Sequence, residues 1–293
     1  MTVGPLDRSD APAALAAWNR SAPHDPLSAS LFDEKVWGDP AGLALAARQS
    51  GEVVGLAVGV LWPVPDTLRG SVRLLAVVPE ARRQGVATAL VDALADRLAA
   101  DGATSLRLAE AAPNYLTPGV DERYASGRAF AAARGFREIG ESVNLGVDLA
   151  QDWSTEADEA RLARAGVAVR RAGDGDRDRL GRLLDAHWPA WHPEADRALA
   201  AGSLHLAARD GRALAFAAHG ATNAEAGWFG PMGTAPDARG LGLGAVLLRR
   251  CLSDLAARGH RRATIAWAAA LPFYARAAGA TVDRRFRRFE RPL

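Results

Sequence analysis

The sequence predicts an α/β protein made of two tandem copies of one unit, and three observations support this. Residues 79–87 resemble residues 236–244 in the order of their proline, acidic, arginine and glycine positions. Each segment follows an apolar run and opens an amphipathic stretch, as a strand, a glycine-bearing turn and a helix would. The length of 293 residues also suits two domains of roughly 150 residues each.

The elements before the turn are expected in the same order in both copies. A helical stretch comes first, and a hairpin follows it. In the first copy these are residues 11–18 and the strands 43–48 and 53–61, with a turn at Ser50-Gly51; in the second they are residues 177–188 and the strands 204–209 and 213–219, with a turn at Asp210-Gly211.

The elements after the turn repeat as well. Each amphipathic helix ends near a glycine, Gly102 or Gly259, and a short apolar strand follows. A short helix then ends at Gly135 or Gly279, where glycine suits a left-handed C-cap. A closing strand is expected to complete each copy, over residues 137–148 and 281–290.

The boundary between the copies is expected in the polar segment 151–164. This places an N-terminal domain at residues 1–152, a linker at 153–166 and a C-terminal domain at 167–293. The first copy also carries an inserted loop, residues 111–126, which contains two of the three tyrosines.

Composition excludes several classes of protein. The single cysteine, Cys251, allows no intrachain disulfide and no thiolate cluster. No His or carboxylate set has metal-ligand spacing, so no metal is expected. With 36 Lys plus Arg against 34 Asp plus Glu, no basic field predicts a nucleic-acid partner. The longest apolar run, Val53 to Val64, is too short for a membrane span. We therefore expect a soluble, cytoplasmic protein.

The repeated turn is suited to binding a phosphate. Backbone amides at a helix N-terminus lack intrahelical partners, and the helix dipole adds positive potential there. Arg82 and Arg239, at the entrance of the two turns, can contribute charge to the same anion. A Walker loop is excluded because no Gly-Lys-Ser/Thr is present, and the compact glycine pair fits a dinucleotide fingerprint poorly. The alternative is that the glycines have only a structural role and allow a tight strand-to-helix turn that binds no ligand.

This pattern resembles motif A of the GNAT superfamily of acetyl-CoA-dependent N-acyltransferases, and the short helix with its terminal glycine resembles motif B. The resemblance covers nearly the whole chain as two copies, in a tandem arrangement of the mycothiol synthase type. It implies that each domain has a mixed, mostly antiparallel central sheet flanked by helices. It also implies that acetyl-CoA is the acyl donor and that a small-molecule amine is the acceptor.

The resemblance further implies which residues bind the cofactor. The loop amides would hold the CoA diphosphate, and the preceding strand would bond the pantetheine arm. In the first copy the positions are Ala76, Val77, Val78, Arg82, Arg83, Gln84, Gly85, Val86, Ala87 and Thr88. In the second they are Met232, Gly233, Thr234, Arg239, Gly240, Leu241, Gly242, Leu243, Gly244 and Ala245. The first loop departs further from the pattern, with Arg83 and Ala87 where glycine is commoner.

Acetyl transfer from a thioester needs a proton for the departing thiolate, and a phenol can supply it. Tyr274 occupies the motif B position where the superfamily often carries a tyrosine, five residues before Gly279. The same offset in the first copy gives Phe130, so the C-terminal copy is the expected catalytic one and a degenerate N-terminal copy is the matching expectation. Tyr115 or Tyr124 in the inserted loop could instead serve an active N-terminal copy.

No motif in the sequence identifies the general base that would deprotonate the amine. Glu225 is the first choice in the second copy, with His219, His187 and His192 as alternatives, and Glu110 is the equivalent in the first copy. Trp188 and Trp191 could be core residues or an acceptor wall. The arginine run 284–291 is expected to be a solvated edge, and Cys251 a buried thiol.

The predicted function is therefore acetyl transfer to a primary amine by direct attack in a ternary complex. The alternative is a non-catalytic CoA-binding, sensing or scaffold protein with two inactive copies. Acceptor identity and oligomeric state are not encoded in any motif of the chain.

Overall fold

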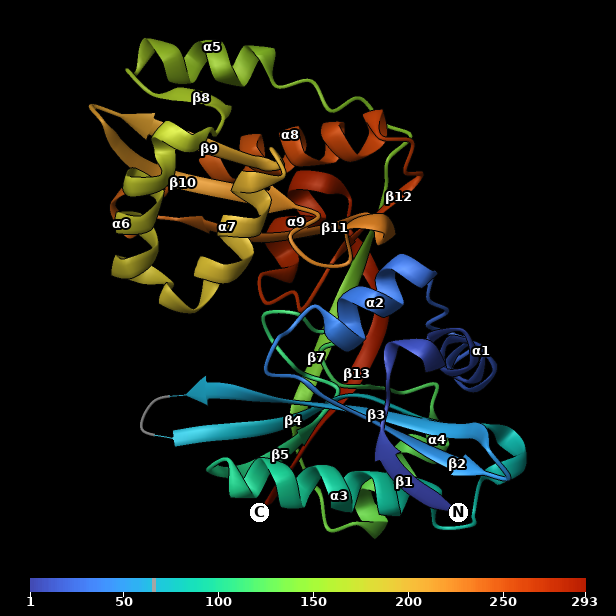
Figure 1. The fold of residues 1–293 in the computed structure, drawn as a ribbon. Helices are drawn as coiled ribbons and strands as arrows, with labels where there is room; N and C mark the ends of the chain where they lie inside the picture. Colours follow the sequence, from blue (N-terminus) through green and yellow to red (C-terminus); the bar gives the residue numbers. More distant parts are fainter. Residues whose placement is uncertain (65–66) are drawn as a thin grey trace. The chain divides into compact units, whose positions relative to one another are not determined.

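A computed structural model describes residues 1–64 and 67–293. The chain divides into two compact units, residues 1–142 together with 285–293, and residues 143–284. Each unit is described by itself (Figure 1).

The first unit contains most of the chain up to strand β7. Its helices are α1 (Ala11–Ser21), α2 (Ala29–Trp37), α3 (Val86–Ala100) and α4 (Ala125–Ala133). Its strands are β1 (Thr2–Pro5), β2 (Leu43–Gln49), β3 (Glu52–Val64), β4 (Thr67–Val77), β5 (Ala103–Leu108) and β6 (Val120–Asp121), and β7 (Arg137–Asp148) begins in this unit.

The sheet of the first unit is mixed and mostly antiparallel, as the resemblance implies. Strands β1 to β4 pair antiparallel in order, and β4 and β5 are parallel. Helices α1 and α2 cover one face and α3 the other (Figure 1). The apolar side chains of α3, including Val86, Leu90 and Leu94, pack on glycines of β3, because Gly55 and Gly59 leave room for them.

The second unit repeats this order. Its helices are α5 (Glu156–Arg164), α6 (Arg177–His187), α7 (His192–Ala200), α8 (Leu243–Ala257) and α9 (Leu271–Ala278). Its strands are β8 (Ala168–Arg171), β9 (Leu204–Arg209), β10 (Arg212–His219), β11 (Trp228–Thr234) and β12 (Arg262–Ile265), and β13 (Thr281–Pro292) begins in it. Strands β8 to β11 pair antiparallel in order, and β11 and β12 are parallel.

Both predicted hairpins are present. The turn residues Ser50, Gly51, Asp210 and Gly211 all have positive φ values, between 50° and 88°, a conformation that tight hairpin turns require. The predicted linker is partly helical, because α5 lies within it.

The closing strands correct a sequence-based expectation. They were expected to complete the copy in which they occur, but each completes the other sheet. Residues 145–148 of β7 pair antiparallel with β12, and residues 290–292 of β13 pair antiparallel with β5. Sequence order could not reveal this, since both strands have the same length of 12 residues and similar exposure patterns.

The arginine run also differs from its expected solvated edge. Arg287 forms ion pairs with Glu122, Glu138 and Glu141, and Arg288 pairs with the fully buried Glu110. Charge complementarity therefore helps to hold the last strand in the first unit. Over the described residues, no helix combines the length and the apolar character that crossing a membrane would require.

Candidate functional site

In the first unit, β4 and β5 separate partway along their length. Their parallel ladder ends at Val72 and Leu108, and the last bond runs from the amide of Ala109 to the carbonyl of Val72 at 2.8 Å. Beyond this point β4 continues to Val77, paired with β3 on one side only. The second edge of residues 73–77 therefore offers backbone groups to a ligand.

The turn after β4 leads into the N-terminus of α3 at Gly85, and this N-terminus is the helix mouth of the first unit. Gly85 is the N-cap of α3 with φ 81°, and a Cβ built there would have nothing within 4 Å. The first helical bond runs from the amide of Ala89 to the carbonyl of Gly85, so the amides of residues 86–88 precede the helical ladder. This arrangement suits an anion such as a phosphate.

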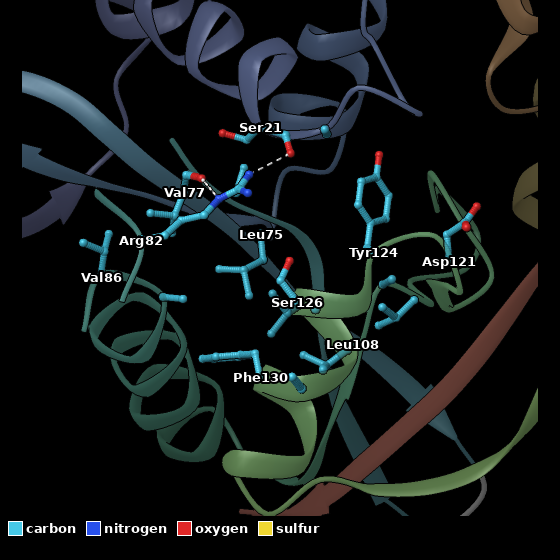
Figure 2. Close-up of a pocket in the computed structure, with 18 of the residues that line it drawn as sticks. Ser21, Leu75, Val77, Arg82, Val86, Leu108, Asp121, Tyr124, Ser126 and Phe130 are labelled. Carbon is cyan, nitrogen blue, oxygen red and sulfur yellow. Dashed lines mark hydrogen bonds between the residues drawn. The ribbon is translucent and has the colours of Figure 1, made fainter. Parts of the chain in front are cut away.

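A cavity of about 570 Å³ connects these two features (Figure 2). The predicted cofactor residues that line it are Ala76, Val77, Arg82, Arg83, Gly85, Val86, Ala87 and Thr88. Its other walls are the end of α1, residues 116–121 and helix α4. Of the remaining predicted positions, Val78 is buried in the core and Gln84 is exposed, bonded to the carbonyl of Glu80.

Arg82 lies across the cavity between β4 and α1. Its Nε donates to the carbonyl of Val77 at 3.1 Å, and its Nη2 donates to the carbonyl of Ser21 at 3.2 Å (Figure 2). These bonds fix a guanidinium group beside the helix mouth, where it adds positive charge for an anionic ligand.

Tyr124 also lines the cavity, at the N-cap of α4. Its hydroxyl donates to Oδ2 of Asp25 at 2.8 Å and accepts from the amide of His24 at 3.1 Å. The alternative of a tyrosine from the inserted loop thus has a structural basis for Tyr124. The sequence did not single out Asp25, because it lies 99 residues away in a loop without a motif. Tyr115 is buried in the same loop as Tyr124.

The second unit has the same backbone features. The ladder between β11 and β12 ends at Phe229 and Ile265, and Gly242 is the N-cap of α8 with φ 83°. The predicted cofactor residues 232–234 and 239–245 lie on β11 and at this helix mouth. Arg161 of α5 donates to the carbonyl of Leu241 at 3.2 Å from both terminal nitrogens.

Large side chains pack against these features in the second unit. The indole of Trp188 lies on Gly233, so closely that an added Cβ would be 2.5 Å from its Cζ3. The ring of Phe273 and the methyl of Met232 lie on Gly244, at 3.3 and 3.4 Å from an added Cβ. Trp188 stacks on Trp191 with ring centroids 5.4 Å apart. This favours the core interpretation of the tryptophan pair.

The expected acid Tyr274 is half-buried among aromatic rings. Its ring centroid is 6.3 Å from that of Phe229 and 5.1 Å from that of Phe273. Burial raises the pKa of Tyr274 to about 12, which makes its proton harder to remove at neutral pH. Cys251 is fully buried, and burial raises the pKa of its thiol.

The candidate bases of the second unit lie in different settings. Glu225 is exposed in a short turn between β10 and β11. His219 is fully buried, with Nε2 3.1 Å from Oδ2 of Asp254, and His205 bonds the same oxygen at 2.8 Å. Burial opposes ionisation of Asp254, but hydrogen bonds from His205, His219 and Arg171 hold its pKa below the usual range. His219 is therefore part of a buried polar cluster.

The other two histidine candidates lie on α6 and α7, and the first-unit candidate Glu110 is in the core. The ring of His187 is 5.3 Å from that of Trp188, and His192 bonds Asp185 at 2.8 Å. Glu110 is fully buried and bonded to Arg107 and Arg288. In the part of the chain that the structure describes, no group of three or more His, Cys, Asp or Glu side chains could hold a metal ion.

Comparison with known proteins places these features in context. The sequence model of the acetyltransferase (GNAT) family matches residues 8–117 and 177–280. One similar structure is described as a GCN5-related glucosamine N-acetyltransferase region of a fungal multi-domain GH3 beta-N-acetylglucosaminidase. Its TM-score is 0.85 at 22% identity, over 99% of this chain and 38% of that one.

Two other similar structures match along nearly their whole length. A tandem GNAT protein from the clavulanic acid biosynthesis pathway has a TM-score of 0.72 at 18% identity, over 99% of this chain and 98% of that one. A GCN5-related N-acetyltransferase from Sphaerobacter thermophilus has a TM-score of 0.70 at 17% identity, over 99% and 95%. At these identities the likeness concerns the fold.

Proposed function

Because the chain belongs to the acetyltransferase (GNAT) family, whose fold supports acyl-CoA-dependent acetyl transfer, we propose that it moves an acetyl group from acetyl-CoA to a primary amine of a small molecule. We assign the reaction to the first unit, in place of the second unit that the sequence favoured. The observation that carries this assignment is the cavity of about 570 Å³ between the open edge of β4 and the mouth of α3.

The residues of the first unit fit this cofactor. The amides of residues 86–88 and the guanidinium of Arg82 would hold the diphosphate, because they bring donors that precede the helical ladder and positive charge to one place. The edge of β4 at residues 75–77 would bond the pantetheine arm, as an added strand bonds a sheet edge. When bound, acetyl-CoA supplies the thioester whose acetyl group is transferred and whose sulfur leaves as a thiolate.

Tyr124 is the proton donor in this proposal. It lies in the wall of the same cavity as the strand edge and the helix mouth. A free phenol has a pKa of about 10 and a free thiol one of about 8.5, so a well-placed phenol can supply a proton to a departing thiolate. The proposal keeps the direct attack of the amine in a ternary complex that the family resemblance implies, and the cofactor residues and the acid line one cavity.

The second unit fits a supporting role. Trp188 and Phe273 lie where a ligand would approach Gly233 and Gly244. This packing favours the non-catalytic alternative for that unit. The roles of Tyr274, Glu225 and the second loop, residues 239–245, stay predictions.

Two measurements test the proposal. Calorimetric titration with acetyl-CoA is expected to give one binding event per chain. A thiol-detection assay is expected to show CoA release with at least one amine from a panel of aminosugars, polyamines and amino acids. Glucosamine is the first probe, since one similar structure is described as a glucosamine N-acetyltransferase. Binding without CoA release for the whole panel would favour the sensing alternative, and no binding would refute both.

A further inference from the structure

Asp25 is a buried carboxylate at the wall of the first unit's cavity. Its residue is 8% exposed and belongs to the loop between α1 and α2. The loop is fixed on both sides of the carboxylate. The indole Nε1 of Trp18 donates to the carbonyl of Asp25 at 2.8 Å, and the amide of Asp25 donates to the carbonyl of Ala22 at 3.0 Å.

The carboxylate of Asp25 is in direct hydrogen-bond contact with the phenol of Tyr124. The phenol donates to Oδ2 of Asp25 at 2.8 Å, and the amide of His24 donates to the phenol oxygen at 3.1 Å. The phenol thus has one defined donor and one defined acceptor, so its orientation is set before any ligand binds. A base and an acid in direct hydrogen-bond contact can exchange a proton without a water molecule.

The second carboxylate of the cavity wall has a different environment. Asp121 accepts three hydrogen bonds from Arg123, from its amide, Nε and Nη2. A guanidinium therefore balances its charge. The carboxylate of Asp25 accepts the hydrogen bond of the Tyr124 phenol.

We propose that Asp25 is the general base of the reaction, that it selects a cationic primary amine as acceptor, and that its bond to Tyr124 joins base and acid in one proton relay. The inference rests on the proposed function of the first unit. A buried carboxylate attracts an ammonium group and can then remove one of its protons.

The steps balance in atoms and charge. Asp25 takes one proton from the ammonium, which leaves a neutral amine. The nitrogen lone pair forms a C–N bond to the acetyl carbonyl carbon while the C–S bond breaks and its electrons stay on sulfur. Tyr124 gives its proton to the thiolate, and Asp25 returns the captured proton to the phenolate across the 2.8 Å contact. The new amide nitrogen releases its extra proton to solvent, so both side chains end as they began.

The central test is the variant Asp25→Asn, which keeps the shape of the side chain and an oxygen acceptor for Tyr124. With the best amine of the panel, kcat/KM is expected to fall ~100-fold at neutral pH, while the Kd for acetyl-CoA stays within about threefold. The residual rate is expected to rise log-linearly with pH up to the pKa of the amine, because only the neutral amine then reacts. A weakly basic hydrazide acceptor, already neutral at pH 7, is expected to lose far less activity.

Binding provides a readout that does not depend on turnover. The amine is titrated calorimetrically into protein saturated with CoA, and Asp25→Asn is expected to weaken its binding ~10-fold. Asp25→Glu is expected to restore part of the loss in both assays. Tyr124→Phe is the second variant, and it is expected to retain the amine affinity because Asp25 remains.

The outcomes separate this inference from the proposed function. If the wild-type protein releases CoA and Asp25→Asn does so at the same rate with both amine and hydrazide, the base assignment is wrong and the proposed function stands. An equal loss with both acceptors, together with unchanged amine binding, also overturns the base assignment, because it indicates only a structural role. If the wild-type protein binds no acetyl-CoA or acetylates no amine, the proposed function fails and the inference fails with it.

Discussion

The two units of this chain share the same arrangement of strands and helices but differ in the side chains that lie next to the splayed strand and the helix mouth. Both have a strand that loses its parallel neighbour and a glycine with φ just above 80° at the following helix mouth. The residue directly after α1 is Ala22, and the residue directly after the matching helix α6 is Trp188. Six residues before the cap glycine stands Ala129 in one and Phe273 in the other.

We propose that these few side chains decide whether each unit offers a ligand site. Ala22 and Ala129 line the cavity of the first unit. Trp188 and Phe273 lie directly on glycines of the second. Burying such rings also stabilises the second unit, because aromatic side chains contribute large buried areas.

The largest effect is expected when the phenylalanine of the second unit, Phe273, is introduced at the matching position of the first unit, Ala129. Ala129→Phe is expected to weaken acetyl-CoA binding ~1000-fold, about 4 kcal/mol, because the new ring occupies the cavity beside the helix mouth. Calorimetric titration measures the change. The matched control is Phe273→Ala in the second unit, for which the Kd of the first-unit site should not change. Equal affinities of the wild type and Ala129→Phe would place the ligand elsewhere.

The next effect distinguishes the two candidate acids. Tyr124→Phe is expected to lower kcat ~100-fold with little change in cofactor affinity, since one proton donor is lost. Tyr274→Phe is expected to leave kcat within about twofold. Steady-state rates of CoA release measure both variants. The reverse result would return the chemistry to the second unit and to the tyrosine that motif spacing selected.

The sequence predicted much of the fold because the repeat carries local signals. The hairpin turns, the two helix mouths and the family resemblance follow from short motifs, and the family match confirms the resemblance. The exchange of the closing strands could not be predicted. Pairing partners of β7 and β13 depend on contacts far apart in sequence, such as Arg288 with Glu110, and no local pattern encodes them.

The candidate site was predictable only in its backbone part. The residues of the first loop line the cavity, because glycine spacing reports the shape of a turn. Motif spacing pointed to Tyr274 and to Phe130, but the phenol in the cavity wall comes from Tyr124, at the end of an inserted loop. Its partner Asp25 becomes visible only when the loop after α1 is placed in space.

A smaller effect is expected on the stability of the second unit. Gly233→Ala is expected to destabilise the protein by about 1–3 kcal/mol, because the new methyl would meet the Trp188 ring at 2.5 Å. The equivalent position of the first unit, Ala76, already carries this methyl. Chemical denaturation measures the change. Trp188→Ala combined with Gly233→Ala should remove the clash, and a persisting steric cost would contradict the described packing.

The smallest expected effect is the pH response of the second unit. Burial holds the pKa of His205 below its usual value, so the folded unit binds fewer protons than the unfolded chain near and below pH 6.5. The stabilisation is therefore present above this pH and is lost as pH falls, by at most ~1.4 kcal/mol per pH unit for one histidine. Hydrogen exchange of residues 204–219 at pH 7 and pH 5 measures it. His205→Gln is expected to flatten the response, and an unchanged slope would exclude His205 as its source.

If the first unit alone binds the acyl donor, hydrogen exchange with and without acetyl-CoA will reveal it. Added acetyl-CoA is expected to protect residues 75–88 and 116–134 and to leave exchange in residues 228–245 unchanged. Protection of residues 228–245, with residues 75–88 exchanging as before, would contradict this expectation.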